Sequence, residues 1–276
     1  MKEPRYAIDQ AWHRERERLA SLEAVFDPWE IPQFEAVGIK EGWNCLEIGA
    51  GGGSIAEWFC KRVGPTGKVV ATDLDTRFVE LIEERNLEVR KHDIAVDELE
   101  ENFFDIVHAR GVMEHLTDRQ SAIGNMVGAL KPGGYLIISS GDYLSFMPTV
   151  DVDEDLFLRV SSKFLELLSL SGFDPNYGRR VRRLLLEANL VDVRLEGYVI
   201  EWGGDLPGTE VWTLLFEQLS RQVVERKMAQ EEEITQFLSM IREPSFRAMG
   251  PILVTGEAEK RYLEWSIASG SAAAML

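Results

Sequence analysis

Short apolar runs rich in Val and Ile alternate with amphipathic stretches from Trp43 to about residue 140. The apolar runs predict strands at 44–48, 68–73, 87–91, 104–109 and 134–140. The stretches between them repeat apolar residues with helical spacing and predict helices near 53–63, 76–85 and 118–130. Strands that are apolar throughout and separated by helices indicate a parallel sheet covered on both faces.

The alternation loosens after residue 140, but two more strands are predicted, at 190–200 and 246–259. Helices are predicted over 153–171 and 178–189, and two more within 207–241. We therefore predict an α/β fold with a doubly wound, mostly parallel sheet of seven strands. Two insertions, at about 142–176 and 201–245, follow strand ends. Because open α/β sheets bind ligands there, we interpret both insertions as helical lids over a substrate.

The N-terminal segment predicts a helical cap over residues 1–40, ahead of a main domain at 41–276. Residues 5–26 carry helical periodicity among alternating charges. The pairs Asp27-Pro28 and Ile31-Pro32 predict that the helix is broken there, because proline removes a backbone donor and clashes with the preceding turn.

Composition narrows the class of protein. The chain is 45% hydrophobic and 28% charged, which is typical of soluble globular proteins. It shows neither a signal peptide nor the ~20 consecutive apolar residues of a membrane span, so a cytoplasmic location is expected, with no membrane partner. A net charge of −17 argues against a nucleic-acid partner, which needs basic stripes. Cys45 and Cys60 lack metal-ligand spacing and predict buried apolar positions. We expect a monomer or homodimer.

Residues 46–54, LEIGAGGGS, join a predicted strand to a predicted helix through four glycines in five positions. Glycine at this density lets another group approach the backbone closely. The dinucleotide fingerprint is not met, because Ser54 stands where its third glycine belongs, and no Gly-Lys-Ser/Thr follows to make a P-loop. A phosphate, a nucleoside and a bare tight turn are all compatible with the glycines alone.

Carboxylates follow three successive strands. Glu47 ends the first, where it would repel a pyrophosphate and suits a cationic or zwitterionic ligand such as S-adenosylmethionine. Asp73 ends the second and suits two ribose hydroxyls, while Asp75 competes for this role and is predicted to cap the next helix. Asp93 follows the third strand and suits an adenine amine, with the Ile94 amide donating to the ring. Each acid alone is as readily a surface charge, but three at successive strand ends indicate one ligand.

These residues resemble the class I S-adenosylmethionine-dependent methyltransferases of the small-molecule type, over about residues 40–142. Glu47-Ile-Gly-Ala-Gly-Gly-Gly53 matches the family's acid-x-Gly-x-Gly-x-Gly motif, VVATDLD carries its ribose acid and KHDI its adenine acid. FDIVHARGVMEHL and LKPGGYLIIS match its fourth strand and the approach to its fifth. The resemblance implies a Rossmann-like sheet and S-adenosyl-L-methionine as cofactor. The implied cofactor contacts are Glu47, Gly49, Ala50, Gly51, Gly53, Ser54, Asp73, Leu74, Asp93, Ile94, Ala109 and Arg110.

Motifs of two other groups of methyltransferases are missing, which excludes two classes of substrate. No NPPY- or DPPY-type motif of nucleic-acid amino methylation is present, and the loop RGVMEHL lacks the paired glutamates of protein arginine methyltransferases. What remains implies methyl transfer to an O, N or C atom of a small metabolite. Aromatic residues and methionines in the two insertions suit an apolar or aromatic acceptor, although most of them are expected in the core.

Three residues near the predicted methyl position are candidates for chemistry. His115 follows the fourth strand and is the nearest candidate base, with packing as the competing explanation. Asp142 and Tyr143 follow the fifth strand and could orient an acceptor, or could simply belong to a linker. His108 lies inside the fourth strand and is expected in the core.

Three N-terminal residues are candidates for the methionine end of the cofactor: Tyr6, Trp12 and Arg18. Arg18 could pair with the methionine carboxylate. The competing interpretation is a solvated helix with an apolar seam.

Three other functions stay open from the sequence. An S-adenosylmethionine-binding cyclase of natural-product biosynthesis would carry the same cofactor residues. An NAD(P)-dependent oxidoreductase is opposed by Glu47 and Ser54. A regulatory binding module without turnover is the fourth possibility.

Overall fold

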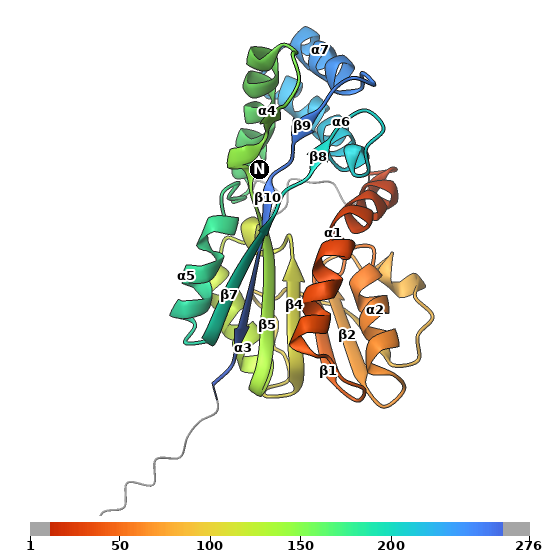
Figure 1. Ribbon diagram of the computed structural model, residues 1–276, viewed down its shortest axis with the longest axis vertical. Coiled ribbons are helices and arrows are strands. Elements are labelled where there is room, and N and C mark those ends of the chain that lie inside the picture. Colours follow the sequence, from red (N-terminus) through yellow and green to blue (C-terminus); the bar gives the residue numbers. More distant parts are fainter. Residues whose placement is uncertain (1–11, 262–276) are drawn as a thin grey trace, which may run out of the picture.

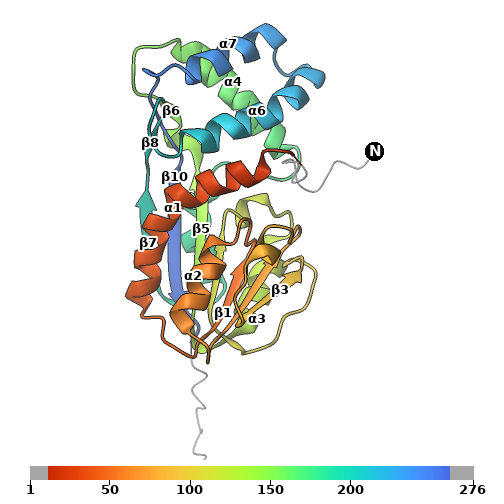
Figure 2. The same ribbon diagram turned by 90° about the vertical axis from the view of Figure 1, so that its right-hand side faces the viewer.

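The computed structural model describes residues 12–261, which form a seven-stranded sheet with helices on both faces and a helical lid at one end (Figures 1 and 2). The strand order is β3-β2-β1-β4-β5-β10-β7. Strands β1 to β5 run parallel, and β10 lies antiparallel to β5 and β7. The strands are β1 (Asn44–Ile48), β2 (Lys68–Asp73), β3 (Leu87–Lys91), β4 (Phe104–Arg110), β5 (Leu130–Asp142), β7 (Val191–Tyr198) and β10 (Ile252–Glu259). The predicted fold class is confirmed.

Alternate residues of the strands enter two separate cores. On β1, Cys45 packs on the face covered by α2 (Ser54–Val63). Its neighbour Leu46 packs on the opposite face, with α3 (Arg119–Ala129) and α5 (Val181–Glu187). Burial on both faces is why these strands are apolar throughout. Both cysteines are free and buried, as predicted.

A third core lies in the lid. The lid consists of α4 (Glu154–Ser169), α6 (Thr209–Glu225), α7 (Glu231–Ile241) and a small sheet of β6 (Met147–Pro148), β9 (Ala248–Met249) and β8 (Glu201–Trp202). These elements come from the two predicted insertions and from the segment before β10, and they stand together beyond one end of the main sheet (Figure 1). Phenylalanine and tryptophan rings fill the lid core.

Helix α1 (Glu15–Val37) runs through Pro28 and Pro32, so the predicted break in this helix is wrong. Each proline removes one backbone hydrogen bond, but tertiary packing holds the helix on either side of them. Phe26 lies in the lid core, and Phe34 lies in the core between the sheet and α2. Helix α1 therefore links the lid to the sheet (Figure 2). The predicted division into a cap at 1–40 and a domain at 41–276 stays a prediction.

Two further local predictions are corrected. The helix expected at 76–85 does not form: the segment holds one 3₁₀ turn, η1 (Val79–Leu81), and continues into extended Ile82, whose side chain lies against Gly53. Asp75 consequently caps no helix. Strand β5 begins at Leu130 rather than at 134, and its pairing with β4 shifts register beside this early stretch. The remaining short turns are η2 (Met113–His115), η3 (Tyr143–Ser145) and η4 (Gly178–Arg180).

Residues 12–261 contain neither a membrane-spanning helix nor a group of side chains arranged for a metal ion. No helix in this range is both long and apolar enough to cross a membrane. Within the same range, no group of three or more His, Cys, Asp or Glu side chains is arranged to hold a metal ion.

The lid core predicts a large effect of truncating one of its central rings. Phe157 is 0% exposed and packs against Phe146, Trp202 and Phe246. Phe157→Ala should lower the free energy of unfolding in urea by ~3–5 kcal/mol, because a buried ring leaves a cavity. Leu158→Ala is the matched control, since Leu158 is 40% exposed and should change stability by less than ~0.5 kcal/mol. Equal effects of the two changes would contradict the assigned core.

Candidate functional site

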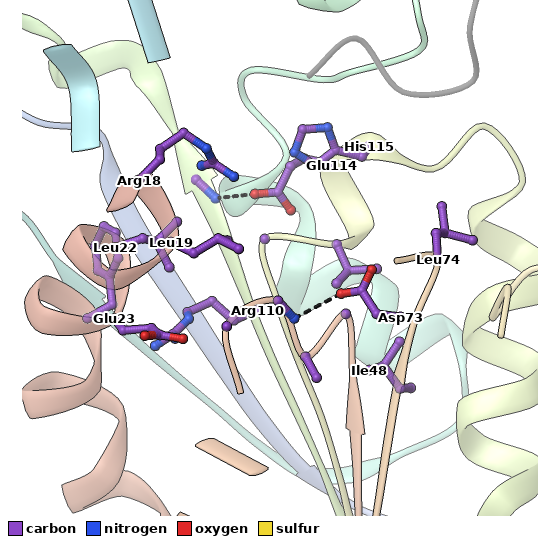
Figure 3. A pocket seen from close by; sticks show the side chains of 18 of the residues that line it. Arg18, Leu19, Leu22, Glu23, Ile48, Asp73, Leu74, Arg110, Glu114 and His115 are labelled. Atoms are coloured by element: carbon purple, nitrogen blue, oxygen red, sulfur yellow. Dashed lines mark hydrogen bonds between the residues drawn. The ribbon is translucent and has the colours of Figure 1, made fainter. Parts of the chain in front are cut away.

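A cavity lies above the carboxyl ends of β1, β2 and β4, beside α1 and beneath the lid (Figure 3). Two regions of its wall are chemically different. The loop side follows β1, β2 and β3 and is polar; it comprises residues 49–54, 73–75 and 92–94. The lid side follows β4 and β5 and includes the lid; it carries Glu114, His115, Tyr143, Leu168, Phe173 and Trp212. The cavity therefore offers a polar place for one ligand and a mainly apolar place for another.

The glycine turn is occupied largely by side chains of the protein itself. A Cβ atom at Gly49 would overlap Val112, and one at Gly52 would overlap the carboxylate of Glu23 from α1. Gly49, like Gly51 and Gly53, also has a positive φ, which favours glycine. The groups that approach the glycine backbone closely are thus in part side chains of the protein itself, Val112 and Glu23. It brings α1 directly over the turn, and the amide of Ser54 donates to Glu23 at 3.4 Å.

The carboxylate of Asp73 fixes the geometry of the loop side. It accepts hydrogen bonds from the backbone amides of Gly51 at 2.9 Å and Asp75 at 3.0 Å (Figure 3). Asp93, after β3, accepts from the amide of Ala95 at 3.1 Å. The amide of Ile94 donates to no other described residue. An ionised carboxylate accepts up to about four hydrogen bonds, so these contacts do not prevent either group from also binding a ligand.

Beneath the turn, Glu47 belongs to a buried ion-pair network that joins α1 to β1 and β4. His108, which is 0% exposed, places its Nδ1 atom 2.6 Å from Glu47 and its Nε2 atom 3.4 Å from Glu30. Arg110 pairs with Glu30 at 2.6 Å and with Asp27 at 2.9 Å. We call these five residues the floor network. Glu47 is therefore a buried carboxylate that is paired with His108.

The pKa directions show where charge is balanced. Burial alone would lower the pKa of His108, but the carboxylates of Glu47 and Glu30 outweigh burial and raise it to about 9. Burial would raise the pKa of Glu30, but Arg110 and His108 lower it to about 2. Burial raises the pKa of Glu47, and His108 offsets this only in part. The positive charge of the floor network thus offsets the burial of Glu47 only in part.

A charge count gives the same result. The floor network has three carboxylates, of Asp27, Glu30 and Glu47, and two cationic groups, of His108 and Arg110. One cation is missing for balance. Glu47 also lines the cavity, so a ligand cation in the cavity could supply it.

Of the three residues predicted to take part in the chemistry, two line the cavity and one does not. His115 and Tyr143 line the lid side of the cavity, whereas Asp142 is absent from its wall. Asp142 instead forms a two-pronged ion pair with Arg179, at 2.6 and 2.7 Å, which lowers the pKa of Asp142. Burial lowers the pKa of His115 to about 3, with the charges of Arg18 and Arg119 adding to the effect. His115 is therefore a neutral imidazole at neutral pH.

Most of the predicted cofactor residues meet at this cavity, and three of the described ones do not. The predicted residues that line it are Glu47, Gly49, Ala50, Gly51, Ser54, Asp73, Leu74, Asp93, Ile94, Arg110 and Arg18. Gly53, Ala109 and Trp12 are not part of the wall: Gly53 lies against Ile82, and Ala109 is buried inside β4. Arg18 pairs with Glu15 at 2.6 Å. Tyr6 lies outside the described residues.

Several residues of the wall were not predicted. Glu114 directly precedes His115 and is 5% exposed, and Glu23 and Leu19 come from α1. Phe173 comes from the first insertion, whereas Trp212, from the second, is one of the aromatic residues for which an acceptor-side position was considered. The sequence pattern indicates these positions only weakly. Aromatic residues of the insertions are typical of a hydrophobic core, and the acids of α1 are typical of a solvent-exposed helix face.

Comparisons with known proteins agree with this geometry. Residues 46–138 match the family model described as "Methyltransferase domain". Curated relatives include the ubiquinone/menaquinone biosynthesis C-methyltransferase UbiE of Francisella tularensis subsp. novicida, 28% identical over 118 residues. The corresponding protein of Pseudomonas fluorescens is 31% identical over the same length. These alignments cover 40% of this chain and 47% and 46% of the two relatives.

Over residues 46–138 this chain is therefore similar to a methyltransferase domain. The chain spans about half the length of the curated relatives it matches. Solved structures extend the likeness of the fold beyond the domain. The phosphoethanolamine N-methyltransferase 2 of Haemonchus contortus gives a TM-score of 0.57 at 16% identity, covering 92% of this chain and 59% of that one. A putative methyltransferase of Bacillus halodurans gives 0.54 at 19% identity, covering 85% of this chain and 100% of that one.

The raised pKa of His108 predicts a pH dependence of stability. The group's pKa is about 9 when folded and ~6.5 when unfolded, so its contribution is complete below pH ~6.5 and is lost as the pH rises through about 9. The free energy of unfolding should fall on the order of 1–3 kcal/mol across this window. His115, whose folded pKa is lowered, contributes only below pH ~6.5 and does not overlap.

Urea unfolding at a series of pH values between 6 and 9.5 measures this contribution. His108→Gln is the comparison, because it removes the titrating group; its stability should change less over the window. A wild-type stability that is flat or rising from pH 6.5 to 9 would contradict a protonated His108.

Proposed function

We propose that this protein transfers the methyl group of S-adenosyl-L-methionine to a small, apolar or aromatic acceptor. The observation that carries the proposal is that the floor network has one more carboxylate than cationic groups and that Glu47, immediately below the glycine turn, is its carboxylate on the cavity wall. S-adenosylmethionine carries an ammonium, a sulfonium and one carboxylate, and it has no phosphate. Its ammonium would restore charge balance at Glu47, whereas a pyrophosphate would worsen it.

The loop side of the cavity suits the nucleoside of this cofactor. Asp73 would accept the ribose hydroxyls in addition to the amides of Gly51 and Asp75. Asp93 would accept from the adenine amine, and the Ile94 amide would donate to the ring. Glu47 and Arg110 would lie at the methionine end. The methyltransferase match over residues 46–138 supports this assignment.

The protein's contribution to the reaction is mainly to hold and shield the reactants. The bound cofactor supplies an electrophilic methyl group. The lid side then orients the acceptor, and proximity of this kind contributes up to ~7–11 kcal/mol to catalysis. Leu168, Phe173 and Trp212 line this side and exclude water from it. Their apolar character is what favours an apolar or aromatic acceptor.

The related proteins have names that match this proposal in general terms only. Two curated relatives are C-methyltransferases of quinone biosynthesis, and one solved neighbour is an N-methyltransferase of phosphoethanolamine. The proposal for this chain is limited to a small-molecule acceptor. A cytoplasmic location and a monomeric or homodimeric state belong to the same proposal.

Replacing Asp73 tests the cofactor assignment. Asp73→Ala should weaken S-adenosylmethionine binding by ~1–3 kcal/mol, because charge-assisted hydrogen bonds are lost. Isothermal titration calorimetry measures the affinity, and thermal unfolding checks that the variant is folded. Glu57→Gln is the control, since Glu57 lies on α2, away from the cavity wall, and should bind normally.

Two results would sink the assignment. The first is an unchanged affinity of Asp73→Ala for S-adenosylmethionine. The second is tight binding of NADH by the wild-type protein without measurable binding of S-adenosylmethionine. Formation of S-adenosylhomocysteine in the presence of an acceptor separates methyl transfer from a cyclase that only binds the cofactor.

A further inference from the structure

Glu114 is a buried carboxylate on the lid side of the cavity that the cofactor assignment does not use. It belongs to η2, directly after β4, and is 5% exposed. Its carboxylate accepts from the hydroxyl of Ser140 at 2.8 Å and from the amide of Gly141 at 3.2 Å. Figure 3 shows it on the cavity wall between Arg18 and Arg110, beside His115.

Within the part of the chain that the structure describes, Glu114 has no ion-pair partner. Among residues 12–261, no cationic group lies within 4.0 Å of its carboxylate. The other acid at this end of the cavity, Glu15, is paired with Arg18 at 2.6 Å. Burial raises the pKa of Glu114, although its hydrogen bonds to the backbone and to Ser140 and the charge of Arg119 oppose this. A buried carboxylate without a counter-charge is costly, and such groups concentrate at functional sites.

The position of Glu114 separates it from the nucleoside. The loop side, with Asp73 and Asp93, lies at the ends of β2 and β3, whereas Glu114 follows β4 and Gly141 lies near the end of β5, on the other side of β1. Near Glu114 the wall includes the uncharged side chains of Tyr143, Phe173 and the neutral imidazole of His115, and the ion pair of Arg18 with Glu15 also lines the cavity. An acceptor in this place would meet the carboxylate of Glu114 as a strong hydrogen-bond acceptor beside aromatic side chains.

We propose that Glu114 binds an O–H or N–H group of the methyl acceptor and takes up its proton. The inference rests on the proposed function. In the transfer, the S–CH₃ bond breaks and its electron pair stays on sulfur, a new bond forms between the methyl carbon and the acceptor's oxygen or nitrogen, and the acceptor's proton passes to Glu114. The acceptor class is therefore an uncharged aromatic or polycyclic molecule with a hydroxyl or amine, and carboxylate-bearing molecules are excluded by Glu114.

Binding of three matched probes tests this assignment without turnover. In the presence of saturating S-adenosylhomocysteine, 2-naphthol offers a donor, 2-methoxynaphthalene offers the same rings without one, and 2-naphthoate adds a negative charge. Phenols ionise near pH ~10, so 2-naphthol is neutral at pH 7. The wild-type protein should bind 2-naphthol about tenfold or more tightly than the other two probes, as a hydrogen bond to a buried carboxylate requires.

The variant Glu114→Gln should lose most of this preference while binding S-adenosylhomocysteine with unchanged affinity. Glu257→Gln is the matched control: Glu257 is a half-buried acid on β10 whose pKa burial also raises, but it is not on the cavity wall. It should keep the wild-type preference. If the wild-type protein binds 2-naphthol no better than 2-methoxynaphthalene, or if Glu114→Gln keeps the preference, the inference is wrong.

The same titrations separate this inference from the proposed function. Absence of S-adenosylhomocysteine binding to the wild-type protein would overturn the proposed function itself. Normal binding of S-adenosylhomocysteine without a preference for 2-naphthol would overturn only the role of Glu114. The comparison of probes on the wild-type protein gives this result even if Glu114→Gln does not fold.

Discussion

The ion pair between His108 and Glu47, with Glu30 and Arg110 behind it, is the interaction on which the rest of the structure depends. It is buried at the carboxyl ends of β1 and β4, where desolvation is expensive and each charge needs a partner. Breaking such a network leaves an uncompensated charge, which typically costs ~3–5 kcal/mol. Because Asp27 and Glu30 come from α1, the network also fixes this helix over the sheet.

The position of α1 in turn determines the shape of the cavity. From the floor network, α1 passes over the glycine turn, where Glu23 occupies the space that a side chain at Gly52 would need. Further toward its N-terminal end, α1 packs against α6, and Arg14 forms an ion pair with Glu217 at 2.7 Å. The glycine turn, the floor network and the lid thus surround the same cavity, and α1 contacts all three.

Much of the fold could be predicted because the information is local. The apolar runs that became β1 to β4 are buried on both faces, so their composition alone identifies them. The acids after β1, β2 and β3 meet at one edge because parallel strands end together. By contrast, Pro28 and Pro32 predicted a break that packing over the length of α1 prevents, and the helicity of 76–85 was outweighed by the contact of Ile82 with Gly53.

The site was less predictable because its charges depend on pairs that are distant in sequence. Glu47 and His108 are 61 residues apart, and Glu30 and His108 are 78 apart. The sequence alone predicts that His108 is buried, which is correct, but it does not show that His108 is the ion-pair partner of Glu47. Asp142 looked available until Arg179, 37 residues away, was placed beside it. Glu114 was overlooked because His115, the more familiar base, stands next to it in the chain.

The central claim is that Glu47 needs a cation and receives it from the amino-acid end of the ligand. The most direct test compares the calorimetric affinities of S-adenosylhomocysteine and 5′-methylthioadenosine, which share the nucleoside but differ in the amino acid. The account predicts that the wild-type protein binds S-adenosylhomocysteine about tenfold or more tightly, and that Glu47→Gln removes most of this difference. Equal affinities in the wild-type protein, or a difference that survives in Glu47→Gln, would contradict it.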